Sequence, residues 1–305
     1  MWFRRRLTYE RYVAIESMPD GIVLVVQSGL DAPRFEHVSI SRCELGQQAE
    51  VLAGMVRELG LKGLPCSVVL NTEQYSVQSL ERPNVEPEEM SQAVRWKIRE
   101  YVEGDLSQWV VDWYDVPEDG TRGRARQVVA VMARRSAVER IIGIVRESGL
   151  ILDTIDIATM ALRNLLAVQP ETHPGLARAV LWVRDNEALI DFTKDNAVYL
   201  SRRVEVDLNA LADPDQRDWV GQNLALEVQR SMDYFDSQMR QAPPRALHVL
   251  ANSQVDVLRS QLNEGLGLDV VLLDVPGVEL ELAGEVALAA GAALRHLRLL
   301  EEAAA

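Results

Sequence analysis

Hydrophobic and polar residues alternate along the start of the chain in a way that predicts three short strands joined by turns. The second half of the chain opens with the same pattern. The predicted strands are Tyr12–Glu16, Ile22–Gln27 and Arg34–Ile40 in the first half, and Ala179–Val183, Ala188–Phe192 and Ala197–Arg203 in the second. A helical pattern follows in each half, over Leu45–Leu59 and over Asp215–Gln241. The pattern therefore predicts an α/β protein whose two halves begin alike.

The stretch Pro87–Val116 differs from the rest because it combines a helix, a strand and three tryptophans. Pro87 suits the first helical position, where its missing N–H is not needed. One side of the predicted helix is apolar at helical spacing, and it consists of Met90, Ala93, Val94, Ile98 and Tyr101. Trp96 falls outside this stripe, among polar residues. We therefore predict that Trp96 does not belong to the buried face.

The strand that follows the helix has a period of two. Trp109 and Trp113 lie on one side of it, whereas Tyr114 and Val116 lie largely on the other. Two interpretations of the tryptophan pair remain open, a contribution to the core, which we favour, and a contribution to a binding surface.

Turns and loops divide the chain into four predicted parts. Residues 1–72 form the core of a first lobe, and residues 73–150 carry a β-α-β-β-α pattern that predicts an inserted α+β subdomain. Two prolines and a glycine in residues 169–175 mark a boundary, so we assign residues 151–175 to a connection between the lobes. Residues 176–305 form the second lobe.

The composition narrows the function. The 305 residues are 48% hydrophobic, enough for substantial cores, and a net charge of −14 argues against a nucleic-acid partner. Cys43 and Cys66 have neither disulfide nor zinc spacing, and the four histidines lie far apart, so we predict no metal site and a cytoplasmic protein. No apolar run reaches the roughly 20 residues of a membrane span. The basic segment Met1–Arg6 either contacts an anionic membrane surface or, as we favour, is an unstructured tail.

Four local strings carry a family resemblance. They are Glu73–Val77 (EQYSV), Ala93–Lys97 (AVRWK), Ala130–Arg135 (AVMARR) and Glu227–Phe235 (EVQRSMDYF). These strings resemble the PilM branch of bacterial actin-like proteins, including its divergent MshI-type members from the mannose-sensitive hemagglutinin (MSHA) pilus system. The resemblance spans nearly the whole chain and is strongest over residues 72–160 and 220–300. It implies a two-lobed actin-like (ribonuclease H-like) fold with an inserted subdomain, as in PilM and FtsA.

The resemblance also implies a function. Members of this family are cytoplasmic components of type IV pilus or related secretion platforms at the inner membrane, and they dock on a short segment of a PilN-like membrane protein. In the family that segment lies between the inserted subdomain and the first lobe. We accordingly assign partner binding to Trp96, Tyr101, Trp109 and Trp113, with Trp96 as the candidate anchor. A pilus assembly ATPase is a further candidate partner.

The first nucleotide loop departs from the family pattern. The family's Asp-x-Gly becomes Glu16–Met18, and the next residue, Pro19, has no N–H to offer a phosphate. The family's lysine position is occupied by Val23.

The second and third nucleotide motifs depart as well. The second Asp-x-Gly reads Trp182–Arg184, and Glu187 adds a negative charge where phosphate would lie. The glycine pair of the third motif reads Ala251-Asn252. Each hydrogen bond to a charged phosphate is worth roughly 1.5–3 kcal/mol, so the loss of several would remove a binding free energy of about 8 kcal/mol. We therefore predict a pseudo-ATPase with no catalytic residues, and binding of ATP and magnesium is not favoured.

Two alternatives stay open. The first is a working ATPase in which Glu16 replaces the metal-binding aspartate. The second is a GspL-like cytoplasmic domain of type II secretion, a family that normally continues into a membrane span. This chain is expected to fit that family less well because it ends in Glu301–Ala305.

Overall fold

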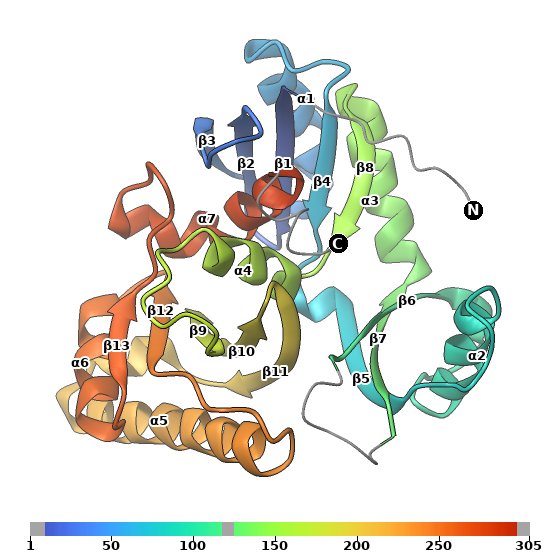
Figure 1. Ribbon diagram of the computed structural model, residues 1–305. Helices are drawn as coiled ribbons and strands as arrows, with labels where there is room; N and C mark the ends of the chain where they lie inside the picture. Colours follow the sequence, from blue (N-terminus) through green and yellow to red (C-terminus); the bar gives the residue numbers. More distant parts are fainter. Residues whose placement is uncertain (1–9, 118–124, 298–305) are drawn as a thin grey trace.

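The first lobe is built on a five-stranded sheet. The computed structural model describes residues 10–117 and 125–297, so the segment Met1–Arg6 lies outside the described residues. The strand order is β3-β2-β1-β4-β8, in which β1, β2 and β3 are antiparallel and β4 and β8 run parallel to β1 (Figure 1). The strands are β1 (Arg11–Met18), β2 (Gly21–Ser28), β3 (Phe35–Arg42), β4 (Pro65–Val69) and β8 (Ile151–Asp156). The three predicted opening strands are thus confirmed.

Helices cover both faces of this sheet, as the nearly continuous apolar sequence of a central strand requires. Val13 and Ile15 of β1 pack on one face with α1 (Gln48–Glu58) and α3 (Arg135–Ser148). Ala14, between them, points to the other face and packs with α7 (Leu280–Ala293). Alternate residues of β1 therefore pack into two separate cores, one on each face of the sheet.

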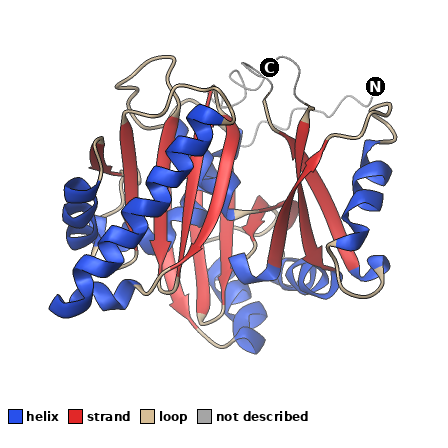
Figure 2. Ribbon diagram, turned by 90° about the horizontal axis from the view of Figure 1, so that it is seen from below, coloured by secondary structure: helices blue, strands red, loops and turns tan. Residues whose placement is uncertain are grey.

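The second lobe repeats this arrangement with the strand order β11-β10-β9-β12-β13. Its strands are β9 (Arg178–Arg184), β10 (Glu187–Lys194), β11 (Ala197–Glu205), β12 (Ala246–Ala251) and β13 (Asp269–Leu272). The helices α5 (Pro214–Ser237) and α6 (Val255–Gly265) cover one face, and Figure 2 shows the long α5 crossing in front of the sheet. The two halves, which the sequence predicted to begin alike, therefore contain sheets with the same number and order of strands.

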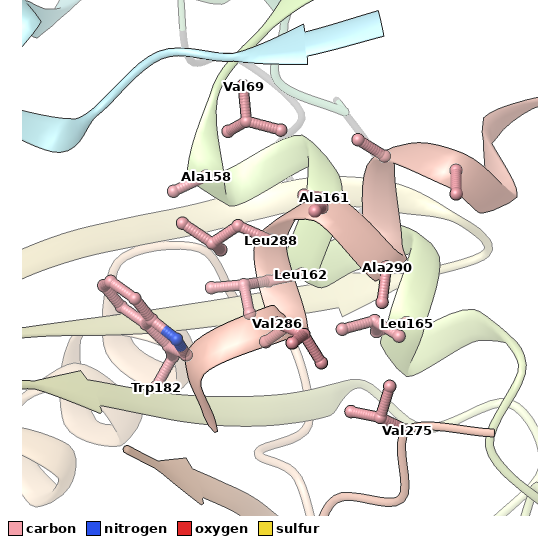
Figure 3. Close-up of a cluster of buried hydrophobic side chains, with 14 of the residues drawn as sticks. Val69, Ala158, Ala161, Leu162, Leu165, Trp182, Val275, Val286, Leu288 and Ala290 are labelled. Carbon is pink, nitrogen blue, oxygen red and sulfur yellow. The ribbon is translucent and has the colours of Figure 1, made fainter. Parts of the chain in front are cut away.

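The helices α4 (Ala158–Ala167) and α7 join the lobes. The α4 helix follows β8 of the first sheet but packs on the second sheet, whereas α7 follows the second sheet and packs mainly on the first. The two helices lie against each other, and Leu162 and Leu288 share one core with Trp182 of β9 (Figure 3). A single apolar core therefore runs through both lobes.

The two helices approach each other closely at Gly291. A Cβ atom on Gly291 would lie 2.1 Å from the carbonyl oxygen of Ala161, so only glycine fits there. The buried Asn164 side chain donates a hydrogen bond of 3.0 Å to the carbonyl of Gly291. The helices thus touch backbone to backbone at one point.

The insert has its own three-stranded sheet, in the order β5-β7-β6, with one helix on it. Its elements are β5 (Tyr75–Glu81), α2 (Met90–Lys97), β6 (Trp109–Asp115) and β7 (Gln127–Arg134). The helix covers one face of the sheet. From the other face Ala133 joins the core of the first lobe, and Val129 packs against the core of the second. The insert therefore contacts both lobes.

The predicted part boundaries differ from the structure in three places. The α3 helix was assigned to the insert, but Ile141 and Val145 pack in the first lobe. Residues 151–175 were assigned to a connection, but β8 pairs with β4 in the first sheet, with Ile155 opposite Val68. The α7 helix was assigned to the second lobe by sequence position, yet it covers the first sheet.

Pro87 does not begin α2, because residues 87–89 form a turn and the helix starts at Met90.

One carboxylate is buried where the second lobe meets α4 and the insert. Asp191 of β10 is fully buried and lies beside the hydroxyl groups of Thr159 and Ser201. Burial raises the pKa of Asp191 to about 7, and the hydroxyl groups of Thr159 and Ser201 offset this only in part. Burial and the nearby Asp191 carboxylate also raise the pKa values of Tyr75 and Tyr114 in the insert. Asp191 is therefore an ionisable group buried at a junction where hydroxyl groups surround it and no cationic residue in the described part of the chain pairs with it.

We expect Asp191→Asn to stabilise the protein at neutral and alkaline pH. The pKa of an unfolded aspartate is about 4, so the folded protein holds an extra proton between about pH 4 and its raised value. The stability that comes from this proton is complete below about pH 4 and is lost as the pH rises to about 7. Urea unfolding should therefore find the variant more stable by up to roughly 4 kcal/mol at about pH 8, with no difference near pH 4.

Asp153→Asn is the matched control for this experiment. Burial alone would raise the pKa of Asp153, but the hydrogen bonds from Tyr12 and His296 lower it overall. This variant should therefore lose stability at neutral pH, and its deficit should shrink as the pH falls. Equal stability of Asp191→Asn and the unmodified chain at about pH 8 would contradict the assignment to Asp191.

Candidate functional site

Two hairpin turns face each other between the lobes. The β1–β2 turn has Pro19 and Asp20 at its centre and Met18 opposite Gly21, and proline and glycine are both common at these positions of a turn. The β9–β10 turn follows Arg184, and Asp185 adopts a left-handed conformation with φ of 49°. Both turns line a cleft of about 1220 Å³. The cleft lies where the two similar sheets present equivalent turns.

A buried ion pair crosses the base of this cleft. Arg184 at the end of β9 donates hydrogen bonds to both carboxylate oxygens of Glu16 on β1, of which the Nη2–Oε2 bond is 3.2 Å long. Glu16 is fully buried. The same guanidinium donates to the carbonyl of Glu285 at 2.9 Å and lies over the ring of Trp182. Burial alone would lower the pKa of Arg184, but the Glu16 carboxylate raises it overall.

Further polar contacts surround the ion pair. Thr72, in the 3-10 turn that follows β4, donates its hydroxyl to Glu187 of β10. Arg203 of β11 pairs with the same carboxylate at 2.6 Å and donates to the carbonyl of Thr72 at 2.8 Å. Asn252 after β12 donates to Asp185 at 3.0 Å. The polar side chains at the rim of the cleft are therefore largely engaged with each other.

The lining of the cleft is acidic. Eight carboxylates line it, namely Asp20, Glu73, Asp185, Glu187, Glu205, Asp207, Glu227 and Glu285. Four guanidinium groups accompany them, those of Arg42, Arg184, Arg203 and Arg230. The carboxylates of the lining outnumber its guanidinium groups by eight to four, and Pro19 has no N–H to donate to a phosphate.

Four positions at which the sequence departs from the family's nucleotide motifs lie close to this cleft. Met18 and Arg184 line it, and Glu16 lies directly beneath as the partner of Arg184. Ala251 packs against α7, where a Cβ atom on Gly284 would lie 2.0 Å from the Ala251 carbonyl oxygen. Glu285, which the sequence analysis missed, enters the site beside that glycine. A glycine in the alanine-rich α7 segment was the available signal for this close approach.

The aromatic residues of the insert separate into two groups. Trp96 is 70% exposed, and the Arg99 guanidinium lies 5.5 Å from its ring centroid. Met90, Val94 and Ile98 are fully buried, so the predicted apolar stripe is confirmed for these three. Trp96 therefore occupies the solvent side of α2.

Tyr101 does not belong to the buried stripe, contrary to its predicted position. It is 48% exposed because α2 ends at Lys97 and a 3-10 turn over Ile98–Glu100 changes the direction of the following side chains. The structure thus places both Trp96 and Tyr101 in solvent.

Trp109 and Trp113 are half-buried beneath α2, packed against the core of the insert. The Trp109 indole donates to the carbonyl of Glu103 at 3.2 Å, and the Arg134 guanidinium lies 4.0 Å from its ring centroid. Arg95 of α2 donates to the carbonyl of Trp109 at 3.1 Å, which fixes the helix on the strand. These two tryptophans thus support the helix that presents Trp96.

Comparison with known proteins identifies the fold. No family model matches the sequence, and a search of curated proteins finds no match. The PilM-PilN type IV pilus biogenesis complex aligns with a TM-score of 0.71 at 20% identity, over 95% of this chain and 99% of that chain. A Bacteroides thetaiotaomicron protein with an actin-like ATPase fold and unknown function aligns with a TM-score of 0.53 at 10% identity, over 91% and 95%.

A third similar structure is the cytoplasmic domain of EpsL, an inner membrane component of the type II secretion system of Vibrio cholerae. It aligns with a TM-score of 0.48 at 12% identity, over 85% of this chain and 97% of that chain. The first two similarities show that the chain has the two-lobed actin-like fold, as the sequence resemblance implied. Within residues 10–117 and 125–297, no helix is both long and apolar enough to cross a bilayer.

We expect single substitutions of the ion pair to destabilise the protein strongly. Glu16→Ala leaves a buried guanidinium without its partner, and Arg184→Met leaves a buried carboxylate, so each should lower the free energy of unfolding by about 3–5 kcal/mol. The double variant Glu16→Leu/Arg184→Met should lose far less than the sum, because an apolar pair removes both charges. Denaturant unfolding of the three variants measures this coupling.

Arg42→Met provides the control. Arg42 pairs with Asp20 and Glu285 at the same cleft, but its side chain is half exposed. Its loss should lower the free energy of unfolding by less than about 1 kcal/mol. Additive losses in the double variant would show that Glu16 and Arg184 do not act as a pair.

Proposed function

We propose that this protein is a non-catalytic, PilM-like scaffold of a type IV pilus assembly platform. The observation that carries the proposal is the alignment with PilM from the PilM-PilN complex over nearly the full length of both chains. In the proposed role the chain binds a short segment of a PilN-like protein at the cytoplasmic face of the inner membrane. The four family-like strings favour an MSHA-type system, with a pilus assembly ATPase as a further partner.

The proposal includes independence from nucleotide. In the cleft, the Arg184 guanidinium is already held by Glu16 and by the carbonyl of Glu285. A phosphate ligand would have to break these buried contacts and then lie among carboxylates. The alternative of an ATPase that uses Glu16 as a metal ligand is less favoured for the same reason, since Glu16 is buried and bound to Arg184.

The proposed docking surface is the solvent side of α2. This helix covers the face of the insert sheet opposite the face that contacts the lobes, so the surface is not the groove between the insert and the first lobe that the family resemblance implied. Large aromatic side chains that become buried at an interface commonly supply much of its binding energy. Trp96 is available for that role because it contributes little to the core, whereas Trp109 and Trp113 hold α2 in place from below. Tyr101 adds a second exposed aromatic ring at the end of the helix.

ATP with magnesium should leave the thermal unfolding midpoint unchanged. Ligand binding stabilises a protein by RT ln(1 + [L]/Kd), so a site with a Kd of about 10 µM would contribute roughly 2.7 kcal/mol at about 1 mM ATP. That contribution would raise the midpoint by about 4 °C for a chain of this size. A shift of this size with Mg-ATP, and none with magnesium chloride alone, would contradict the proposed nucleotide independence.

Trp96→Ala should weaken binding of a PilN-like N-terminal peptide by at least about 30-fold while leaving the unfolding midpoint nearly unchanged. The expected change corresponds to about 2 kcal/mol, a usual value for an aromatic anchor. Fluorescence titration of the peptide and a thermal scan of the same protein sample give the two quantities.

Two variants serve as controls for the Trp96 experiment. Trp219→Ala removes an equally exposed tryptophan from the second lobe and should leave peptide affinity unchanged. Trp113→Ala removes a half-buried ring and should lower stability, since truncation in a core leaves a cavity. Undiminished affinity in a folded Trp96→Ala protein would place the docking surface elsewhere, and a stability loss of several kcal/mol would make Trp96 a core residue.

A further inference from the structure

The interlobe cleft contains an exposed apolar strip on α5. Trp219 is 66% exposed and Leu226 is 47% exposed, and both line the cleft. They are seven residues apart, so they lie on the same side of the helix, about 10 Å from each other along its axis. Val220, Leu224 and Val228 of the same helix are buried against the second sheet. The core of the second lobe therefore does not require the two exposed side chains.

The cleft around this strip has more negative than positive charge. Each guanidinium of the lining already has a carboxylate partner, and the pairs are Arg42 with Asp20 and Glu285, Arg184 with Glu16, Arg203 with Glu187, and Arg230 with Glu227. The lining also contains Glu73, Asp185, Glu205 and Asp207. None of these carboxylates forms an ion pair within residues 10–117 and 125–297. Their negative charge is therefore available to a ligand.

Most of this available charge belongs to the lobe that carries the apolar strip. Asp185 lies in the β9–β10 turn, Glu205 ends β11, and Asp207 follows it. The backbone N–H of Leu208 donates to the carbonyl of Asp185 at 2.9 Å, which holds the turn beside the end of β11. Glu73, in the turn after β4, adds a carboxylate from the first lobe. A ligand in the cleft would thus meet carboxylates from both lobes and apolar side chains from α5.

A basic peptide suits this combination of groups. Arginine and lysine pair with carboxylates, and a guanidinium also stacks on an indole ring such as that of Trp219. A ligand with charge alone would leave Trp219 and Leu226 in water, whereas an apolar ligand would desolvate carboxylates without pairing them. The cleft volume of about 1220 Å³ exceeds the roughly 300–1000 Å³ of most small-molecule pockets. An extended segment can place two side chains on one side over the length of the strip.

We propose that the interlobe cleft binds an extended basic segment of a partner protein that also carries large apolar side chains. The apolar side chains of the segment cover Trp219 and Leu226, and its cationic groups pair with Asp185, Glu205 and Asp207. This site is separate from the solvent side of α2, and the inference does not rest on the proposed docking of a PilN-like segment there.

Isothermal titration calorimetry with the end-blocked peptide Arg-Trp-Arg-Arg-Arg-Leu-Arg tests the proposal. The full chain should bind one peptide per molecule, with affinity that falls as salt is added. Trp219→Ala/Leu226→Ala should bind at least about tenfold more weakly, because the apolar contact is lost. Glu205→Gln/Asp207→Asn should bind about fivefold more weakly, through the loss of two exposed ion pairs. The four substituted side chains are exposed, so thermal scans should find both variants folded.

Matched controls separate the cleft from general attraction to an acidic protein. Glu139→Gln/Glu147→Gln removes two exposed carboxylates from α3, outside the cleft, and should bind the peptide like the unmodified chain. So should Trp96→Ala, which changes the proposed α2 surface. A peptide whose tryptophan and leucine are replaced by serine should bind at least about tenfold more weakly.

Four results would overturn the proposal. They are no binding of the peptide, equal binding of its serine form, equal losses in the α3 and cleft carboxylate variants, and normal binding by a folded Trp219→Ala/Leu226→Ala protein. The chain's own residues 2–6 read Trp-Phe-Arg-Arg-Arg and have a similar composition. Arg4→Ala/Arg5→Ala/Arg6→Ala should leave peptide affinity unchanged. An affinity at least about tenfold higher in that variant would assign the cleft to the chain's own segment instead of a partner.

Discussion

The contact between Glu16 and Arg184 is the interaction on which the arrangement of the lobes depends. The two residues are 168 positions apart in the sequence and come from equivalent ends of β1 and β9. A buried ion pair contributes little net stability compared with an apolar pair, yet the loss of either partner leaves a charge that the interior cannot solvate. The pair therefore acts mainly on specificity, because it disfavours any placement of the lobes that separates the two charges. The contacts of Thr72 with Glu187 and of Arg42 with Glu285 depend on the same placement.

Local patterns predicted the parts of the fold that local interactions determine. The β1–β2 hairpin follows from the turn residues Met18-Pro19-Asp20-Gly21, and the buried side of α2 follows from the spacing of Met90, Val94 and Ile98. The packing of α3 and the pairing of β8 with β4 could not be predicted in this way, since periodicity does not identify the sheet that a strand joins. Tyr101 was misplaced because the change from α-helix to 3-10 turn after Lys97 has no clear signal in the sequence.

The residues of the candidate site also divide into those that short motifs revealed and those that only the assembled fold brings together. The departures at Glu16, Met18, Arg184 and Ala251 were visible one by one, because each alters a short motif. The neutralisation of Glu16 by Arg184 was not visible, because it requires both lobes in their final positions. Glu285 was missed for a related reason, since α7 reaches the cleft only by returning to the first lobe. Chemistry at a boundary between lobes is therefore harder to predict than chemistry within one loop.

The crossing of α4 and α7 at Ala161 and Gly291 limits how the lobes can move. Sliding of one helix along the other would drive side chains into the opposite backbone, because a Cβ atom has no space there. A second close approach, between Gly284 and the Ala251 carbonyl at the end of β12, holds α7 against the second lobe as well. Two glycines on one helix thus fasten it to both lobes, and the bond between Glu16 and Arg184 opposes separation of the lobes without any bound ligand.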